Sequence, residues 1–222
     1  LIASIFSQVH AGETVFSSAD NNLILTSSAL VLLMTPGLAF FYGGFTQAKN
    51  VLNTMAMSFV MMGIATIVWL VFGFSLAFSQ GVSLQNFIGN SLTYSFFENL
   101  PQVWPGLQIP GLSFALFQGM FAIITPALIS GALVERISFR FWCFFTPLWL
   151  IIVYSPLAHM VWGGGLLGKD LDFAGGTVVH ISSGVSALVL AGLVGSRISW
   201  SKGIKPPHNV TQILLGLSLI HI

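Results

Sequence analysis

The sequence predicts an all-α integral membrane protein, and three observations support this fold class. Of its 222 residues, 55% are hydrophobic and only 6% are charged, whereas a soluble domain carries about 25% charged residues. The apolar residues are gathered into long runs, and the mean hydropathy is +0.90. The basic residues lie almost entirely on alternate connections between these runs. Such a chain satisfies its backbone hydrogen bonds within helices that cross a bilayer.

The apolar runs give the elements in order. Five of them are near or above the roughly 20 residues that a helix needs to cross the hydrocarbon core. We predict transmembrane helices at about 23–45, 52–78, 114–134, 141–161 and 175–196, and the start of a sixth from about 209. Pro36 and Pro126 lie inside the first and third of these helices and predict kinks or close contacts there.

The connections predict how the chain is oriented. The first, third and fifth connections hold six of the seven lysines and arginines. These six are Lys49, Arg136, Arg140, Arg197, Lys202 and Lys205, and the seventh is Lys169 on the fourth connection. By the positive-inside rule, the odd connections face the cytoplasm and the N-terminus lies outside. The second connection, at about 79–113, contains Pro101, Pro105 and Pro110, so we expect an ordered or capping external loop there rather than a helix.

Composition and motifs exclude several other classes of protein. The net charge of +1 and the absence of any Lys/Arg-rich run argue against nucleic acid as a partner. A single cysteine, Cys143, cannot form an internal disulfide, and neither a CxxC nor an HExxH motif occurs, so we expect no metal and no cofactor. The chain begins at Leu1 without a clear signal sequence, so we expect an N-terminal piece to be missing.

One ionisable side chain lies deep within the fifth predicted helix. The stretch DFAGGTVVHISSG places His180 among small apolar residues, where a charged group costs at least about 2.5 kcal/mol. The residues that follow it on one helix face are all small, namely Gly184, Ala187, Ala191 and Gly195. Because small faces let membrane helices approach closely, we expect His180 to point into a tight bundle rather than into lipid. From spacing alone, a core histidine with satisfied hydrogen bonds is the simpler interpretation, and a functional histidine is the alternative.

Several ordered blocks of sequence resemble the ammonium transporter family (Amt/Mep, with the Rhesus proteins as distant relatives). DFAGGTVVHISSGVSALVLAGLVGSR, from Asp172 to Arg197, is similar to the family's fifth-helix motif. PGLAFFYGGFTQAKNVLNT resembles the first helix and the turn after it, FQGMFAIITPALISGALVER the third helix, and PLAHMVWGGGLL the end of the fourth. The resemblance covers about residues 22–216.

The resemblance implies a fold and an assembly. The family has eleven helices per subunit in two five-helix halves of inverted topology, and three subunits form a trimer with one pore in each. Residues 1–222 would then be a partial ammonium transporter domain that contains the first half and the start of helix six. The final LSLIHI departs from the family pattern, and we interpret it as a truncation or an artefact of sequencing or assembly. His221 does not match the family's second pore histidine.

The resemblance also assigns roles to aromatic residues. Phe117 and Phe121 lie four residues apart on one helix face, which alone is typical of ordinary packing. They match the family's pore-lining phenylalanines, with Phe121 at the external gate, where an apolar constriction opposes hydrated ions. Trp162 would fit a membrane-interface aromatic belt. It matches the family tryptophan beside the external ammonium site, where a ring face attracts a small cation.

Two ionisable residues complete the predicted site. Asp172 would lie roughly 12 Å from His180 along the same helix, which is too far for a direct pair. We expect a structural and electrostatic role for Asp172, as a helix cap or a clamp on nearby amides, with direct contact to ammonium or its proton as the alternative. His180 matches the first of the family's paired pore histidines. A neutral imidazole both donates and accepts hydrogen bonds, which suits passing ammonia.

The remaining histidines receive no role in the pore. His159, three residues before Trp162, is expected at the membrane interface, and His208 in the basic inner loop is expected to be solvated. His10 lies outside the region of resemblance.

The residues and the resemblance together favour a plasma-membrane or bacterial inner-membrane ammonium transporter. Ammonium would be collected near Trp162, lose its proton around Phe121 and pass His180 as ammonia. The expected partners are ammonium or ammonia, the lipid bilayer, two further copies of the chain and a cytoplasmic regulatory protein. An ammonium-sensing receptor of the same fold is the second hypothesis. A membrane enzyme with a His/Asp metal site is the third, and it lacks a third ligand at matching depth.

Overall fold

The computed structural model describes residues 16–81, 83–168, 172–197, 203 and 206–221. Within these residues it contains helices and no strand. The α-helices are α1 (Ser18–Phe45), α2 (Val51–Phe59), α3 (Met61–Val68), α4 (Phe74–Phe78), α5 (Gly111–Ser130), α6 (Phe139–Trp149), α7 (Ser155–Trp162), α8 (Ser182–Val194) and α9 (Val210–His221). The predicted all-α membrane fold is therefore confirmed. His10, Lys169, Lys202 and Lys205, for which we had sequence expectations, lie outside the described residues.

The five predicted membrane-crossing helices are present. Helices long and apolar enough to cross a membrane run over Ser18–Phe45, Ala48–Phe78, Gly111–Leu133, Phe139–Trp162 and Gly176–Val194. Their ends differ from the predicted ones by a few residues. α9 begins at Val210, as expected for the start of a sixth span. Pro36 lies inside α1, which continues past it as one helix.

Three of these spans contain π-helical segments that the apolar pattern does not predict. The segments are Trp69–Gly73 between α3 and α4, Leu150–Tyr154 between α6 and α7, and Gly176–Ile181 before α8. A π-helical turn adds a residue without ending a helix, so hydropathy does not change across it. His180 lies in the third segment.

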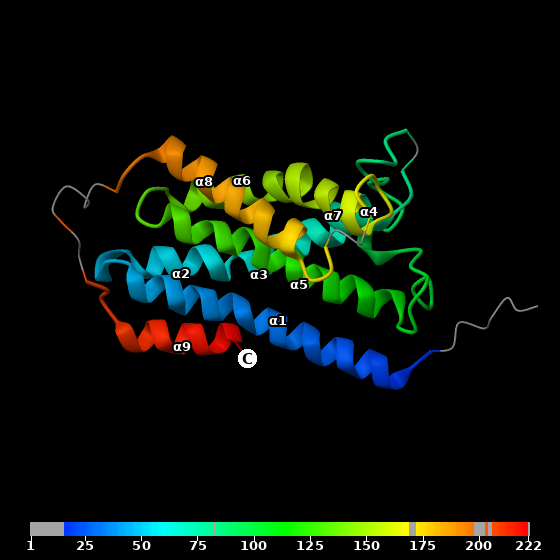
Figure 1. The fold of residues 1–222 in the computed structure, drawn as a ribbon, viewed down its shortest axis with the longest axis horizontal. Coiled ribbons are helices and arrows are strands. Elements are labelled where there is room, and N and C mark those ends of the chain that lie inside the picture. Colours follow the sequence, from blue (N-terminus) through cyan, green and yellow to red (C-terminus); the bar gives the residue numbers. More distant parts are fainter. Residues whose placement is uncertain (1–15, 82, 169–171, 198–202, 204–205, 222) are drawn as a thin grey trace, which may run out of the picture.

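The helices lie roughly parallel to the long axis of the molecule (Figure 1). α5 is the most enclosed span, with 56% of its most apolar window buried. α9 packs along α1 through glycines: a Cβ added at Gly216 would come within 2.6 Å of the carbonyl oxygen of Gly37. This close approach is the small-residue packing expected in membranes.

The two ends of the bundle differ in chemistry. The C-terminal ends of α1, α5 and α8 lie at the left end in Figure 1, and the loop between α4 and α5 lies at the right end. At the left end, the carboxylate of Glu135 accepts hydrogen bonds from the amide of Gln47 at 2.8 Å and from its side chain at 2.9 Å. Nη1 of Arg136 donates to the carbonyl oxygen of Gly195 at 2.7 Å, which caps the end of α8. These bonds tie the odd-numbered connections together.

The loop at the right end is ordered, as its prolines predict. It contains a short 3-10 helix, Ser95–Phe97, and its Trp104 ring stacks on Phe114 of α5 with centroids 4.3 Å apart. Trp104, Pro105, Gly106 and Leu107 form a turn closed by a hydrogen bond of 3.0 Å from the amide of Leu107 to the carbonyl oxygen of Trp104. Gly106 has φ +79°, which favours glycine in the third position of a type II turn. The turn holds Trp104 against α5.

Candidate functional site

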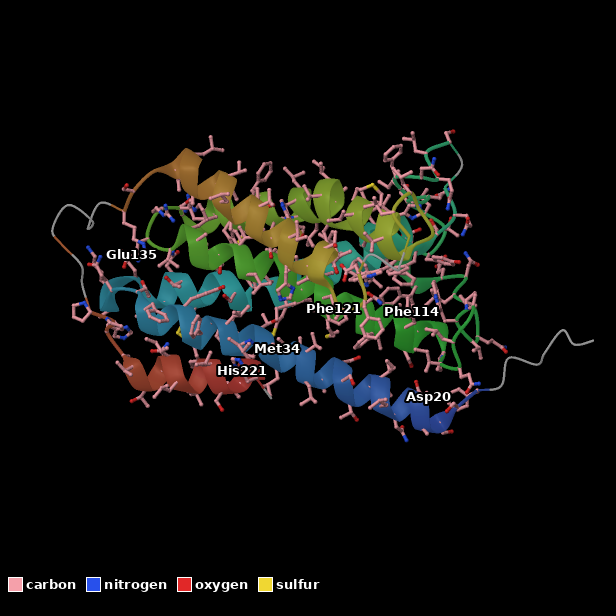
Figure 2. All side chains as sticks on the ribbon, in the orientation of Figure 1. Asp20, Met34, Phe114, Phe121, Glu135 and His221 are labelled. Atoms are coloured by element: carbon pink, nitrogen blue, oxygen red, sulfur yellow. The ribbon has the colours of Figure 1, made fainter. Side chains whose placement is uncertain are left out.

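A pocket of about 860 Å³ opens at the end of the bundle that carries this loop. Its walls are mostly aromatic, and they come from α4, α5, the end of α7, the turn at Trp104 and the segment before α8. The lining residues are Phe78, Trp104, Pro105, Gly106, Leu107, Phe114, Phe117, Gln118, Phe121, Trp162, Asp172, Phe173, Ala174 and Gly175. Figure 2 shows Phe114 and Phe121 toward this end of α5 and Glu135 at the opposite end of the molecule.

Helical spacing along α5 supplies one wall. Phe114, Phe117 and Phe121 recur at intervals of three and four, so they share the face turned toward the pocket. Gln118, four residues after Phe114 and three before Phe121, borders the same face. The rings of Phe117 and Phe121 meet edge to face, with centroids 4.9 Å apart. The centroid of Phe121 is 6.5 Å from that of Trp162. The structure thus brings three of the predicted aromatic residues into one wall, where the negative faces of the rings favour a cation.

Trp162 is held in place by the segment that follows it. Its indole Nε1 donates to the backbone carbonyl oxygen of Asp172 at 3.0 Å. The helix ends at Trp162 because Gly163 and Gly164 follow, and Gly164 has φ +88°. Fixing the indole removes rotamer freedom that a ligand would otherwise have to restrict on binding.

Asp172 clamps the start of the fifth span. Its Oδ2 accepts hydrogen bonds from the amides of Thr177 at 2.7 Å and Val178 at 2.8 Å. The side chain is only 5% exposed. Its second oxygen, Oδ1, is buried and has no hydrogen-bond partner among the described residues. One carboxylate oxygen is therefore used by the fold, and the other is a free acceptor in a residue that lines the pocket.

The expected helical connection between Asp172 and His180 is wrong. Gly175 has φ +82°, and the helix begins only at Gly176. Gly175, in the left-handed conformation, makes a turn before the helix, and this turn allows the side chain of Asp172 to reach the first amides of the helix. The 12 Å helical separation therefore does not apply.

His180 lies outside the residues that line the pocket. Its Nδ1 is 3.2 Å from the carbonyl oxygen of Gly175. The side chain of His180 is exposed among the described residues, and its expected place in a tight bundle stays a prediction for the longer protein. A Cβ added at Gly184, one turn further, would meet nothing within 4 Å. The small-residue face is thus present in the sequence, but no described segment packs against it there.

His159, which we had expected at the membrane interface, is fully buried within the protein, with 0% exposure. Its Nδ1 lies 3.0 Å from the carbonyl oxygen of Ala77, and its Nε2 lies 2.7 Å from that of Gln85. It therefore joins the end of α7 to the end of α4 and to the loop between α4 and α5. These partners are distant in the sequence, so local hydropathy could not identify them. His208 is exposed, as expected.

Sequence reasoning missed Trp104 and Gln118 as lining residues of the pocket. Gln118 could have been found, because it shares a helix face with Phe121. Trp104 could not, because its place depends on how the loop folds. Among the residues that the structure describes, no three His, Cys, Asp or Glu side chains are grouped as a metal ion would need.

Comparison with known proteins agrees with the fold and extends over nearly the whole chain. The sequence model described as Ammonium Transporter Family matches residues 22–222. An ammonium transporter of Aquifex aeolicus is 43% identical, over 99% of this chain and 52% of the relative. A putative ammonium transporter of Methanothermobacter thermautotrophicus is 46% identical, over 93% of this chain and 50% of the relative. The chain thus spans about half the length of these curated relatives.

Solved structures show the same architecture. The crystal structure of Saccharomyces cerevisiae Mep2 superposes with a TM-score of 0.80 and 35% identity, covering 92% of this chain and 47% of that one. A structure titled Sensor Amt Protein superposes with a TM-score of 0.78 and 30% identity, covering 90% of this chain and 51% of that one. On the match of family, relatives and fold, the chain belongs to the ammonium transporter family.

Proposed function

We propose that this chain is the first half of a protein that transports ammonium across a membrane. The observation that carries the proposal is the aromatic pocket at one end of the bundle, where Phe121, Trp162 and the buried Asp172 meet. Each ring face in such a pocket attracts a small cation with about 0.5–2 kcal/mol. A carboxylate beside it adds a charge of the opposite sign at low solvent exposure. The names of the relatives support ammonium as the cation.

The path beyond the pocket follows from the walls. The rings of Phe117 and Phe121 meet edge to face and would narrow this path. Apolar rings oppose a hydrated ion more strongly than a neutral molecule. Ammonium would therefore give up its proton to a water molecule of the open pocket near Phe121 and continue as ammonia. His180 would be the next polar side chain on this proposed path, and its exposed face would be covered by the second half of the protein. A neutral imidazole there would exchange hydrogen bonds with ammonia.

The same proposal includes an assembly and a location. Inverted halves place a substrate path at their interface, so the open face of α8 suits a second half. We propose a homotrimer in the plasma membrane or a bacterial inner membrane, with a cytoplasmic regulatory protein as a further partner. Asp172 would act mainly through its charge and its clamp on the helix, as its two amide hydrogen bonds suggest.

We propose that the pocket faces outward, because the described basic residues gather at the opposite side of the spans. Lys49, Arg136 and Arg197 lie on the odd-numbered connections, and Arg140 lies in the first turn of α6. Single cysteines at the exposed Ser83 and Ser196, in a Cys143→Ser background, test this orientation in intact cells. A membrane-impermeant maleimide should label Ser83→Cys directly and Ser196→Cys only after permeabilisation. If only Ser196→Cys were labelled in intact cells, the orientation would be the opposite of the proposed one.

An ammonium-sensing receptor is the second candidate function. One observation favours it: the chain shares its fold with a structure titled Sensor Amt Protein. A sensor and a transporter can share the same external pocket, so the pocket does not separate them. A transporter carries ammonium across the membrane, whereas a sensor binds it without carrying it across.

Proteoliposomes containing the full-length protein separate the two candidates. For a transporter, labelled methylammonium should accumulate faster than in empty liposomes, the rate should saturate, and ammonium should compete with it. Ammonium binding without any uptake above the empty-liposome rate would refute transport and support the sensor.

A further inference from the structure

His159 is a buried ionisable side chain that the proposed transport path does not use. It lies in the last turn of α7 and is 0% exposed. Its Nδ1 is 3.0 Å from the carbonyl oxygen of Ala77, and its Nε2 is 2.7 Å from that of Gln85. Both ring nitrogens therefore face hydrogen-bond acceptors.

The two carbonyl oxygens depend on this ring for a donor. Ala77 lies in the last turn of the span that ends at Phe78, where helix carbonyl groups lack amide partners. The amide of Gly81, which would continue the helical pattern, donates to the side chain of Gln85 instead. Among the described residues, no backbone amide donates to the carbonyl oxygen of Ala77 or to that of Gln85.

This arrangement requires two N–H groups on the ring. A neutral imidazole has one N–H group and can donate to only one of the two oxygens. The lone pair of its other nitrogen would then face a carbonyl oxygen, and that oxygen would stay unpaired, which is unfavourable. The imidazolium form has an N–H group on each nitrogen and donates to both.

The helix ends around the ring favour the same form. Burying a positive charge is unfavourable unless neighbouring groups offset the lost hydration. His159 lies in the last turn of α7, and the carbonyl group of Ala77 belongs to the last turn of α4. The carbonyl groups at a helix C-terminus carry partial negative charge, which stabilises a protonated histidine.

The segments packed around the ring carry few other ionisable side chains. α4 and the described residues of 79–90 and 163–168 contain none. The described segments that flank α7 carry Tyr154, Asp172 and His180. The carboxylate of Asp172 is bonded to amides of its own segment, and Lys169 and Asp170 lie outside the described residues. The hydrogen bonds of the His159 ring are those to the two carbonyl groups.

These bonds join the segments that carry two aromatic residues of the pocket. Phe78 directly follows Ala77, Trp162 lies three residues after His159, and both rings line the pocket. The ends of α4 and α7 are in close contact, because Gly163 leaves no room for a Cβ beside the carbonyl oxygen of Ala77. The bond to Gln85 adds the first part of the loop between α4 and α5.

We propose that His159 is a positioning residue of the pocket, which as an imidazolium donates to both carbonyl oxygens and so holds Phe78 and Trp162 in place for ammonium. The inference rests on the proposed transport function and adds a dependence of the pocket on pH. At acidic pH both nitrogens carry a proton, and a rise in pH removes one N–H group and its hydrogen bond.

Thermal unfolding of the full-length protein in detergent tests the protonated state. His159→Phe keeps a ring without nitrogen atoms, so it should lower the melting temperature. Because the imidazolium supplies the second bond, this loss should be largest at acidic pH and should shrink as the pH rises from about 5 to 8, where imidazoles change charge. A histidine that is neutral in the folded protein predicts the opposite trend, because acid would have to charge it there.

Two further variants serve as controls. His208→Phe replaces an exposed histidine and should change the melting temperature little at any pH. His159→Gln keeps an N–H donor that does not titrate, so it should recover part of the lost stability, and its melting temperature should depend less on pH. His159→Gln also provides the comparison if His159→Phe does not yield folded protein.

Uptake into proteoliposomes tests the positioning role. At one acidic pH, the ammonium concentration that half-inhibits methylammonium uptake should rise about fivefold in His159→Phe, as expected when pocket side chains must be ordered on binding. The maximal uptake rate should stay near that of the unsubstituted protein, because the groups beyond the pocket are intact. His208→Phe should leave the inhibition curve unchanged.

A difference in melting temperature that is constant with pH, or smallest at acidic pH, would overturn the imidazolium. An unchanged half-inhibiting concentration in folded His159→Phe would overturn the positioning role, because His159 would then serve the fold alone. Absence of uptake by the unsubstituted protein would instead refute the proposed transport, and the pH dependence of unfolding would still report on His159.

Discussion

Asp172→Ala should abolish uptake by the full-length protein and lower its thermal stability. The substitution leaves the amides of Thr177 and Val178 without their acceptor at the start of the fifth span. Hydrogen bonds to a charged group are worth about 1.5–3 kcal/mol each, so the loss should reach several kcal/mol. It also removes the negative charge beside Trp162. Thermal unfolding in detergent and methylammonium uptake measure the two effects separately.

Asp172→Asn separates the clamp from the charge. Its side-chain carbonyl oxygen can still accept from both amides, so the melting temperature should recover most of the loss. Uptake should stay well below that of the unsubstituted protein because the charge is gone. If Asp172→Asn restored both stability and uptake fully, the carboxylate would matter only as a helix cap, and its electrostatic role would be wrong.

The spans could be predicted from the sequence because each depends on a property of the segment itself. A run of apolar residues long enough to cross a bilayer must form a helix there, whatever it packs against. The site was only partly predictable for the same reason. Phe117 and Phe121 share a face that helical spacing defines, and Gln118 borders it. Trp104 lies in a loop, and its ring lines the pocket where the turn at Gly106 allows it to stack on Phe114. Helical spacing does not describe such a residue.

The surroundings of two histidines show the limit of sequence analysis from opposite directions. His159 looks like an interfacial residue in the sequence, but its carbonyl partners come from Ala77 and Gln85, about eighty positions away. His180 has the small-residue face of a packed helix, but in this chain that face is exposed. A residue's own segment sets which face it lies on, and long-range contacts decide whether the face is covered.

Substitutions of His180 should change what the full-length protein conducts rather than how much of it folds. If the imidazole lines the path for ammonia, His180→Ala should lower ammonia flux or admit ions. The substitution removes a group that forms hydrogen bonds with ammonia and leaves a wider path. His180→Asp should favour cations, because a carboxylate can hold one there. Planar bilayer recordings should show current carried by ammonium or potassium with His180→Asp. The exposed position of His180 in this chain means that neither change removes a buried contact here.

A merely structural histidine predicts a different outcome. Both variants would then lose folded trimer, and the protein that survived would keep its selectivity. Normal flux together with unchanged ion selectivity in well-folded His180→Ala would refute its place in the pore.

The aromatic pocket as the entrance for ammonium is tested most directly by the concentration dependence of uptake with Trp162 replaced. In proteoliposomes of the full-length protein, Trp162→Leu removes the ring face and the donor to the carbonyl oxygen of Asp172, and the half-saturating ammonium concentration should rise roughly tenfold or more. Trp162→Phe keeps a ring face, so its half-saturating concentration should lie between those of Trp162→Leu and the unsubstituted protein. A half-saturating concentration that is the same in all three folded proteins would contradict ammonium entry through this pocket.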